Sequence, residues 1–501
     1  MNAPLRRVGV VLVIMFGLLF ANLNWVQAYR ADEYRNSPFN ARVQIAEYQR
    51  ERGLVLTGRD AQPATGNMET TGQLKFRRTY PEEGRWAHVV GYKPVNLAST
   101  GIEAFENDFL AGTSDALFVD RLRDLFTGRR TPGGNVVTTL SRPAQQTAFE
   151  ELAGNGTGTD RGAVVALDPR TGAVQALVSR PSFDPNPLAS HDTSQAQEAY
   201  EELDADPDQP LRNRALAETY HPGSVFKVID TAAALQRGYS PGTSIPAGPS
   251  YQAPQTTHVI RNAAASICPQ AQVTLAVALR DSCNTGFAQL GVELGAAALG
   301  QTAQEFGFGD GELVVGRLDG GGIPVAASET GELVRDDGQD DPPTVALSAI
   351  GQASVRITPM QAALIAATVA NNGVQMRPYL VEELQDSDLT PVYRASPEEL
   401  RRPVAGEVAA QLREMMVDVV NNGTGRNARI PDHVVGGKTG TAETGDGDPT
   451  HGWFIGFVML DGQPVSAVAV FLENAGPGGS GEAARIGGQV MRAVLDDQGA
   501  L

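Results

Sequence analysis

A long apolar run close to the N-terminus is the feature that most constrains how the chain can fold. Arg6 and Arg7 precede Val8 to Ala21, which is uninterrupted apolar sequence, and the apolar character continues to about Tyr29. A helix of about 21 such residues can cross the roughly 30 Å of hydrocarbon in a bilayer. The two arginines ahead of the run predict that the N-terminus lies inside and the rest of the chain outside.

A cleaved signal peptide is the competing interpretation of this segment. Val26-Gln27-Ala28 fits a small-residue cleavage site. The length of the apolar run favours an uncleaved anchor instead, so residues 1–28 are expected to form a short cytoplasmic tip and a transmembrane helix. The protein is then a single-pass protein of the plasma membrane whose bulk folds on the extracellular side.

Length, charge and residue usage limit what the outer part can be. At 501 residues and roughly 150 residues per domain, two or three domains are expected. The formal charge of -18 argues against binding to nucleic acid, which needs a basic surface. The six histidines and two cysteines show no metal-ligand spacing, so neither a metal nor another cofactor is predicted.

The stretch His221 to Leu235, HPGSVFKVIDTAAAL, contains Ser224 and Lys227. Pro222 and Gly223 come just before an apolar run with helical spacing, so Ser224 is expected at or near a helix N-terminus. Residues three apart share a helix face, which brings the hydroxyl within reach of the amine. Serine becomes an effective nucleophile when a neighbour takes its proton, and an amine of lowered pKa can do so. Alone, this spacing also describes a serine cap followed by an exposed lysine.

Lysine is rare in this chain, which gives the pair more weight. Of the 40 lysines and arginines, the lysines are Lys75, Lys93, Lys227 and Lys438. Arginine cannot be deprotonated in a protein, so a retained lysine is a candidate for amine chemistry. Lys438 opens Lys-Thr-Gly-Thr, residues 438–441, so half of the lysines fall in two short motifs.

A third motif lies between these two. Asp281-Ser282-Cys283-Asn284 supplies Ser-x-Asn, which in isolation is typical of a turn with a cap. In order, Ser-x-x-Lys, Ser-x-Asn and Lys-Thr-Gly form the signature of penicillin-recognising serine acyltransferases. The surrounding segments HPGSVFKVID, GGKTGTAET and HGWFIGFV also resemble the transpeptidase domain of class B penicillin-binding proteins, and the short overall plan resembles actinobacterial members. The resemblance covers nearly the whole chain.

This resemblance implies an α+β fold, the penicillin-recognising serine transpeptidase fold, with an antiparallel sheet covered by helices on both faces and a helical lobe. It divides the chain into the anchor at 1–28, a β-rich, non-catalytic pedestal (a dimerisation-like domain) at 29–154, and the catalytic domain at 155–501. The residue pattern predicts strands at 434–442, 452–460 and 465–472, a hairpin around 168–172, helices at 142–152, 358–372 and 482–497, and a polar loop over 183–210.

The implied chemistry is acyl transfer. Ser224 attacks a carbonyl and Lys227 takes its proton, so Lys227 must be neutral at rest, which burial and the charge of Lys438 would both favour. By resemblance, Ser282 relays a proton to the leaving group. Backbone N–H groups of Ser224 and Thr441 are the inferred oxyanion hole.

The resemblance also implies how the substrate is held. Asn284 binds the substrate amide, and Thr439 with Thr441 hold the terminal carboxylate. Gly440 lets the strand backbone approach the substrate closely. The implied substrate is the D-Ala-D-Ala stem peptide of peptidoglycan: release of the last D-Ala gives an acyl-enzyme, and an amine from a second stem resolves it as a crosslink.

The implied setting is cell-wall synthesis, in cell shape or cell division, with β-lactam antibiotics as covalent ligands of the serine. A membrane glycosyltransferase and other cell-wall or division proteins are the implied partners. No Glu-x-x-Leu-Asn segment lies between Ser282 and Lys438, so the penicilloyl-enzyme is expected to be long-lived. A D,D-carboxypeptidase, a β-lactam sensor and a β-lactam-binding scaffold remain alternatives, although the tip from Met1 to Arg7 is too short for a cytoplasmic signalling domain.

Two cysteines add one further expectation. An oxidising exterior makes a disulfide between Cys268 and Cys283 plausible, closing a loop of about 15 residues worth roughly 3 kcal/mol. Two buried free thiols are the alternative. Since Cys283 lies inside Ser-x-Asn, a bridge would also brace the site.

Overall fold

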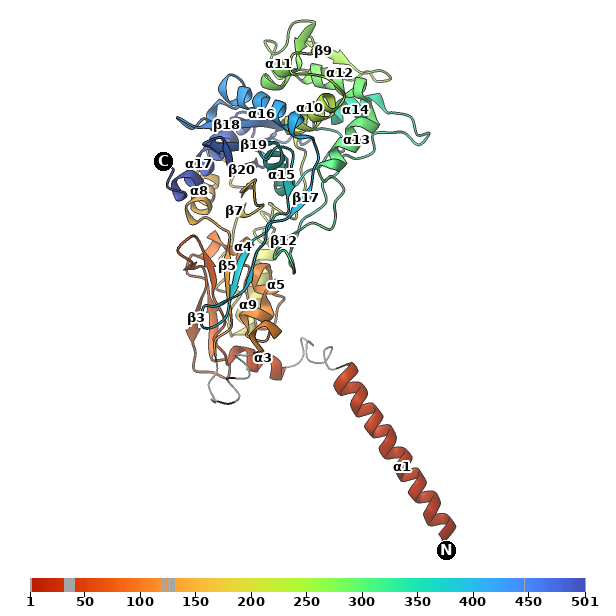
Figure 1. Ribbon diagram of the computed structural model, residues 1–501, viewed down its shortest axis with the longest axis vertical. Helices are drawn as coiled ribbons and strands as arrows, with labels where there is room; N and C mark the ends of the chain where they lie inside the picture. The colour runs from red at the N-terminus through yellow and green to blue at the C-terminus, as the bar shows by residue number, and fades with distance from the viewer. Residues whose placement is uncertain are drawn as a thin grey trace.

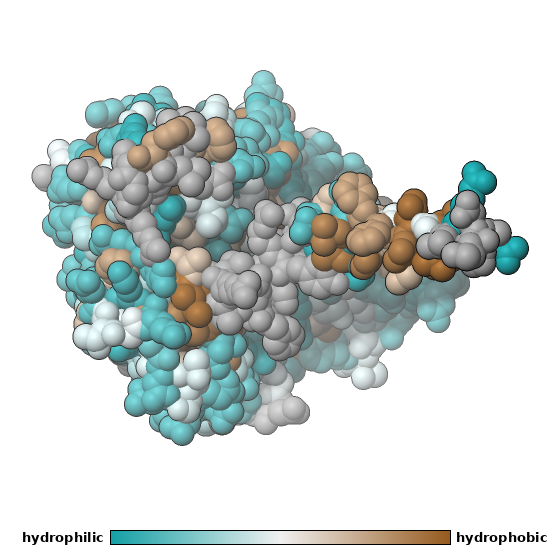
Figure 2. All heavy atoms as spheres, turned by 90° about the horizontal axis from the view of Figure 1, so that it is seen from below, coloured by the Kyte–Doolittle hydropathy of each residue, from teal (hydrophilic) through white to brown (hydrophobic). Residues whose placement is uncertain are grey.

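The computed structural model describes residues 2–30, 41–118, 131–445 and 447–500, together with 123 and 126. Helix α1 (Asn2–Asn24) continues into a π-helical turn (Trp25–Tyr29), and no side chain described in Arg6–Tyr29 is buried. At 1.5 Å per residue this segment of 24 residues is about 36 Å long, enough to cross a membrane. Figure 1 shows it as a lone helix, and in Figure 2 apolar side chains run along it while the folded body is mostly hydrophilic.

A five-stranded antiparallel sheet, in the order β18-β19-β20-β6-β7, forms the centre of the catalytic domain. Its strands are β6 (Gly162–Leu167), β7 (Val174–Arg180), β18 (Val434–Ala442), β19 (His451–Leu460) and β20 (Gln463–Leu472). The hairpin around 168–172 and the three late strands were all predicted. The prediction succeeded because the strands are continuous apolar runs bounded by turn residues such as Asp461-Gly462.

Helices cover both faces of this sheet, as expected. On one face lie α8 (Arg142–Ala153) and α17 (Gly479–Asp497); on the other lie α15 (Pro359–Ala370) and α16 (Gly406–Asn421). Strand β6 shows the division most clearly, because Val164 and Ala166 pack with α8 and α17 while Ala163 and Val165 belong to the core on the opposite side. This alternation is the period-2 pattern of a strand buried on both faces.

The helical lobe consists of α10 (Lys227–Gln236), α11 (Leu275–Arg280), α12 (Asn284–Leu294), α13 (Ala296–Glu305) and α14 (Pro342–Ser348). Two short strand pairs flank the lobe: β8 (Ser244–Pro246) with β11 (Gln272–Thr274), and β9 (Ser250–Gln252) with β10 (Val259–Arg261). A third pair, β12 (Val314–Gly316) with β13 (Gly322–Pro324), packs against the pedestal helix α5 instead. Helix α12 ends at Leu294 because Gly295 has a φ of +83°, which favours glycine.

The pedestal contains a second five-stranded sheet, in the order β16-β15-β5-β1-β2. Its strands are β1 (Val55–Thr57), β2 (Gln62–Pro63), β5 (Asn135–Thr138), β15 (Val381–Gln385) and β16 (Pro391–Arg394). Beside it lie the hairpin β3 (Gly66–Glu69) and β4 (Phe76–Thr79) and the helices α3 (Ala41–Tyr48), α4 (Ala87–Val90), α5 (Gly101–Phe105) and α6 (Asn107–Leu110). A buried ion network holds α5 to this region, with Glu103 accepting from Arg52 (2.6 Å) and Arg78 (2.5 Å).

Three features differ from the expectations. Helix α8 lies within the predicted pedestal range 29–154, but it packs against β7 and α17 of the catalytic domain. Strands β15 and β16 belong to the pedestal sheet although they lie outside the range 29–154, and Figure 1 shows them in cyan among its orange strands. They return to the catalytic domain through β17 (Glu399–Arg401), which pairs with β14 (Gln375–Met376). The polar stretch 183–210 was expected to be a loop, but it contains helix α9 (Thr193–Ala205). Asp192 caps this helix by accepting from the backbone N–H groups of Ser194 and Gln195, a local signal that the polar composition obscured.

Candidate active site

The fold brings the three motifs together at the edge strand β18 of the catalytic sheet. Ser224 lies in a short 3₁₀ turn (Gly223–Val225) directly before α10, and Lys227 is the first residue of that helix. Ser282 lies in the connection between α11 and α12, and Asn284 begins α12. Lys438, Thr439, Gly440 and Thr441 lie in β18. The sequence therefore predicted the position of each motif relative to the ends of its elements.

Lys227 is completely buried and is held by the Ser-x-Asn motif. Its Nζ lies 2.7 Å from Asn284 Oδ1, 2.9 Å from the Ser282 carbonyl oxygen and 3.3 Å from Ser282 Oγ. Ser282 has a φ of +61°, an uncommon backbone conformation for a non-glycine residue that turns both of its oxygens toward the lysine. Burial lowers the pKa of Lys227 to about 7, against an opposing effect of Cys283. A substantial share of this amine is neutral at neutral pH.

Lys438 approaches the same hydroxyl from the strand. Its Nζ donates to Ser282 Oγ and to the Thr439 carbonyl oxygen, both at 2.9 Å, and the side chain is completely buried. Burial first, and the charge of Lys227 second, lower the pKa of Lys438 well below its usual value. Of the two causes expected to lower the pKa of Lys227, burial acts as predicted, whereas the repulsion between the two lysines lowers the pKa of Lys438 instead.

The turn that carries Ser224 is packed directly on β18. A Cβ atom at Gly223, whose φ is +53°, would lie 2.3 Å from the Thr441 carbonyl oxygen, and one at Gly440 would lie 2.6 Å from the Pro222 carbonyl oxygen. Glycine at both positions permits this approach. The Gly223 N–H donates to Gly351 O at 3.0 Å. These contacts set the Ser224 turn beside Thr441, the two residues whose N–H groups were inferred to form an oxyanion hole.

Accessibility separates the groups available to a substrate from those behind them. The Ser224 side chain is half-buried, and its hydroxyl has no hydrogen-bond partner among the described residues. Thr441 is exposed, whereas Thr439 is only 5% exposed. Thr441 on the strand edge is open to solvent and Ser224 is partly so, while Lys227 and Lys438 are completely buried, so a substrate meets the serine before either amine.

Thr424 is a site residue that the sequence reasoning missed. Its hydroxyl forms a short hydrogen bond with the Thr439 hydroxyl, and its side chain is exposed. Thr424 lies in the turn Gly423–Gly425 between α16 and β18, so the only local signal was its nearness to the Lys-Thr-Gly motif. A threonine between two glycines is too common in turns to be singled out.

The two cysteines are neighbours behind Ser-x-Asn. Both are buried free thiols. Their contact, followed by burial, raises the pKa of Cys268, and the same contact lowers the pKa of Cys283, whose Sγ lies 3.6 Å from Thr285 Oγ1. In the structure the two cysteines are therefore the free thiols named as the alternative to the disulfide, although the fold places the two side chains side by side.

Comparisons with known proteins agree with this geometry. Residues 162–494 match the penicillin binding protein transpeptidase domain, and residues 52–136 match the penicillin binding protein A dimerisation domain. The peptidoglycan D,D-transpeptidase PbpA of Mycolicibacterium smegmatis is 40% identical over 499 residues, 99% of this chain and 98% of that protein. PbpA of Mycobacterium tuberculosis is 39% identical over 504 residues, 99% of each chain.

Solved structures give the same result. The ceftriaxone acyl-enzyme complex of penicillin-binding protein A from M. tuberculosis has a TM-score of 0.83 at 39% identity, covering 90% of this chain and 100% of that one. Its penicillin G acyl-enzyme complex has a TM-score of 0.80 at 38% identity, covering 90% of this chain and 99% of that one. The expected fold is thereby confirmed. With a family model that matches most of its length and full-length relatives near 40% identity, the chain belongs to the class B penicillin-binding proteins.

Proposed function

We propose that the protein is a serine D,D-transpeptidase that crosslinks peptidoglycan stem peptides through an acyl-enzyme on Ser224, and that β-lactams acylate the same residue. The observation that carries the proposal is that two buried amines contact one hydroxyl. The Nζ atoms of Lys227 and Lys438 lie 3.3 Å and 2.9 Å from Ser282 Oγ, beside the turn that carries Ser224. The relatives' names and the acyl-enzyme structures supply the reaction class.

In acylation, neutral Lys227 takes the Ser224 hydroxyl proton as Oγ bonds to the carbonyl carbon of the penultimate D-Ala. The charge that develops on the carbonyl oxygen is received by the N–H groups of Ser224 and Thr441. A pKa of about 7 suits this role, because a base is most effective when its pKa lies near the working pH.

Collapse of the tetrahedral intermediate breaks the peptide bond and needs a proton on the leaving nitrogen. The Ser282 hydroxyl supplies it, and protonated Lys227, 3.3 Å away, returns a proton to Ser282. Lys438, on the other side of the same oxygen, orients the hydroxyl. The protons balance: D-Ala leaves with the proton that began on Ser282, and the proton that began on Ser224 replaces it there by way of Lys227.

Deacylation repeats these steps in reverse with an amine of a second stem as nucleophile. Among the described residues, the hydrogen-bond partners of Lys227, Ser282 and Lys438 are hydroxyl, amide and carbonyl groups, with no carboxylate. A water-activating base of the kind that hydrolyses a penicilloyl ester is therefore missing from this set, which supports a long-lived adduct with penicillin.

The setting follows from the rest of the chain. The apolar helix Arg6–Tyr29 supports a single-pass anchor, and the arginines before it support an orientation with the catalytic domain outside the plasma membrane. The pedestal, which resembles the dimerisation domain, is proposed to dock a membrane glycosyltransferase or another cell-wall or division protein.

The proposal is tested on the full-length protein in detergent with a donor stem peptide, with and without an acceptor amine. Mass spectrometry should find crosslinked product only when acceptor is present, and none with Ser224→Ala. Hydrolysed donor without crosslink would instead identify a carboxypeptidase. Labelled penicillin provides a second readout: the label should map to Ser224 by peptide sequencing, and its absence there would refute the acyl-enzyme.

A further inference from the structure

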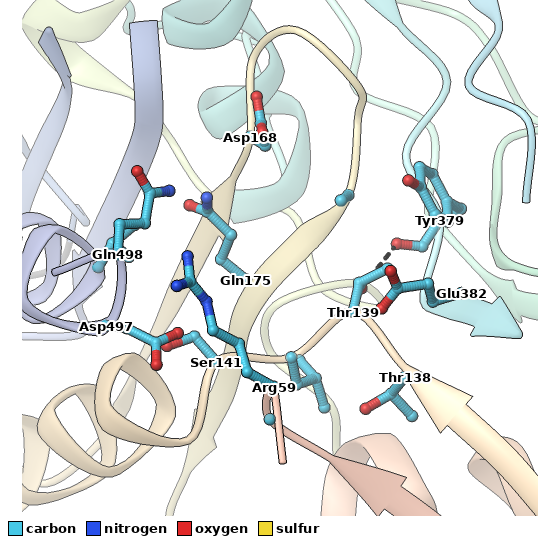
Figure 3. Close-up of a pocket in the computed structure, with 14 residues that line it drawn as sticks. Arg59, Thr138, Thr139, Ser141, Asp168, Gln175, Tyr379, Glu382, Asp497 and Gln498 are labelled. Carbon is cyan, nitrogen blue, oxygen red and sulfur yellow. Dashed lines mark hydrogen bonds between the residues drawn. The ribbon is translucent and has the colours of Figure 1, made fainter. Parts of the chain in front are cut away.

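A polar cavity of about 270 Å³ lies where the pedestal meets the catalytic domain (Figure 3). The β1–β2 turn lines it from the pedestal, the β6–β7 hairpin and the end of α17 line it from the catalytic domain, and the start of β15 closes it. None of the residues that line it belongs to the three catalytic motifs. It is smaller than the roughly 300–1,000 Å³ of pockets that hold drug-sized ligands, which suits a molecule of amino-acid size.

Charges of both signs face this cavity without being paired. Arg59 is exposed at the β1–β2 turn, and Asp497 is the half-buried last residue of α17. In the part of the chain that the structure describes, neither side chain has an ion-pair or hydrogen-bond partner. Asp168 differs, because Arg170 lies 3.1 Å from its carboxylate. Figure 3 shows Arg59, Asp497 and Gln498 gathered on one side of the space and Tyr379 and Glu382 on the other.

A buried amide in the same wall also lacks a partner. Gln175 is only 7% exposed, and its Nε2 donates to the Val465 carbonyl oxygen at 2.8 Å. This bond distinguishes the nitrogen of the amide from its oxygen, and it leaves the oxygen, Oε1, with no hydrogen-bond donor among the described residues. A buried acceptor without a donor is costly, so native structures normally supply one from protein, water or a ligand.

We propose that this cavity binds a small zwitterion, a free amino acid. Its ammonium group is received by the Asp497 carboxylate, and its carboxylate by the Arg59 guanidinium. A metal cation would be attracted by the carboxylates but repelled by Arg59. A simple anion would be attracted by Arg59 but repelled by Asp497 and Glu382. A molecule that carries both charges satisfies each group at once.

The position of the cavity gives binding a consequence. Arg59 belongs to the pedestal sheet region, whereas Gln175 and Asp497 belong to the catalytic domain. A ligand held by Arg59 and Asp497 fixes the two domains relative to each other, so its affinity depends on their arrangement and, by linkage, its presence changes that arrangement.

The test uses full-length protein in detergent whose active site has been blocked with penicillin, so that Ser224 cannot account for binding and a failure of acylation is scored separately. Glycine and both enantiomers of alanine are titrated by calorimetry, with acetate and ethylammonium as single-charge probes. We expect saturable binding of at least one zwitterion and none of either single-charge probe.

Matched variants locate the site. Arg59→Gln and Asp497→Asn should each weaken binding about tenfold or more, the loss expected for a charged hydrogen bond. Asp496→Asn, an exposed neighbour that does not line the cavity, should leave binding unchanged. Circular dichroism checks that the variants are folded. The proposal is overturned if no zwitterion binds, as for a cavity that holds only water, if acetate alone binds as well, or if Arg59→Gln and Asp497→Asn bind like wild type.

Discussion

Replacing Asp230 with asparagine should stabilise the protein at neutral pH. Asp230 lies on α10, one turn beyond Lys227, and is completely buried. Neither of its carboxyl oxygens has a hydrogen-bond partner among the described residues. Burial raises its pKa well above the usual value of 3.8, and the charge of Lys227 offsets this only in part. Asp230 is therefore expected to be neutral in the folded protein and ionised in the unfolded chain.

The sign and size of the effect follow from proton linkage. A carboxyl whose pKa is raised by folding binds more protons folded than unfolded, so its contribution to stability is full below about 3.8 and is lost as pH rises toward the folded-state pKa. In that window the loss reaches about 1.4 kcal/mol per pH unit. Asparagine has the same shape and does not titrate. The stability difference between Asp230→Asn and wild type should grow with pH at up to this slope.

Urea unfolding of the full-length protein in detergent, followed by tryptophan fluorescence at roughly pH 5, 6 and 7, measures the difference. The exposed Asp496→Asn is the matched control, and its difference from wild type should not change with pH. Penicillin acylation rates provide a second readout. If Asp230 were instead ionised and paired with Lys227, Asp230→Asn would destabilise the protein and move the acidic limb of the acylation profile to lower pH, and that result would refute the reasoning.

Three further predictions concern the site itself. Lys227→Arg should acylate with penicillin about 10² to 10⁴-fold more slowly than Lys438→Arg, because guanidinium cannot act as a base; equal rates in folded variants would remove Lys227 from that role. Thr424→Val should slow acylation roughly 2- to 10-fold, the worth of one neutral hydrogen bond, while Thr424→Ser stays close to wild type; equal loss in both would indicate a packing effect. Alkylation of unreduced, denatured protein should modify both Cys268 and Cys283, because the structure holds them as free thiols, and a mass showing both unmodified would instead identify a disulfide.

The catalytic sheet and the motif positions could be predicted because local sequence encodes them. Buried strands such as β19 and β20 are apolar runs separated by Asp-Gly, and Ser224 follows Pro-Gly at a helix start. Each of these signals lies within a few residues of the element it defines.

Contacts between distant segments could not be predicted in this way. The pairing of β15 with β5 joins residues more than 240 positions apart, and the alternation within β15 does not say which sheet it enters. Likewise, the hydroxyl pair of Thr424 and Thr439 and the unpaired amide of Gln175 arise from packing between elements. Helix α9 was not predicted because its residues bury little apolar surface and so show no strong apolar period. Its capping residue was the main local signal of a helix.

The return of β15 and β16 to the pedestal has a mechanical consequence. The chain crosses between the two domains after β5, before β15 and after β16, and the segment 183–210 between β7 and α10 also packs against the pedestal. Bodies joined by a single peptide segment can swivel about it, whereas bodies joined at separate points resist torsion because each connection limits rotation about the others. Movement imposed on the pedestal by a partner near the membrane should therefore reach the catalytic sheet as a push or tilt of the whole unit. A cut at residue 154 would leave neither half with a complete sheet edge, since the pedestal would lose the strand that covers β5.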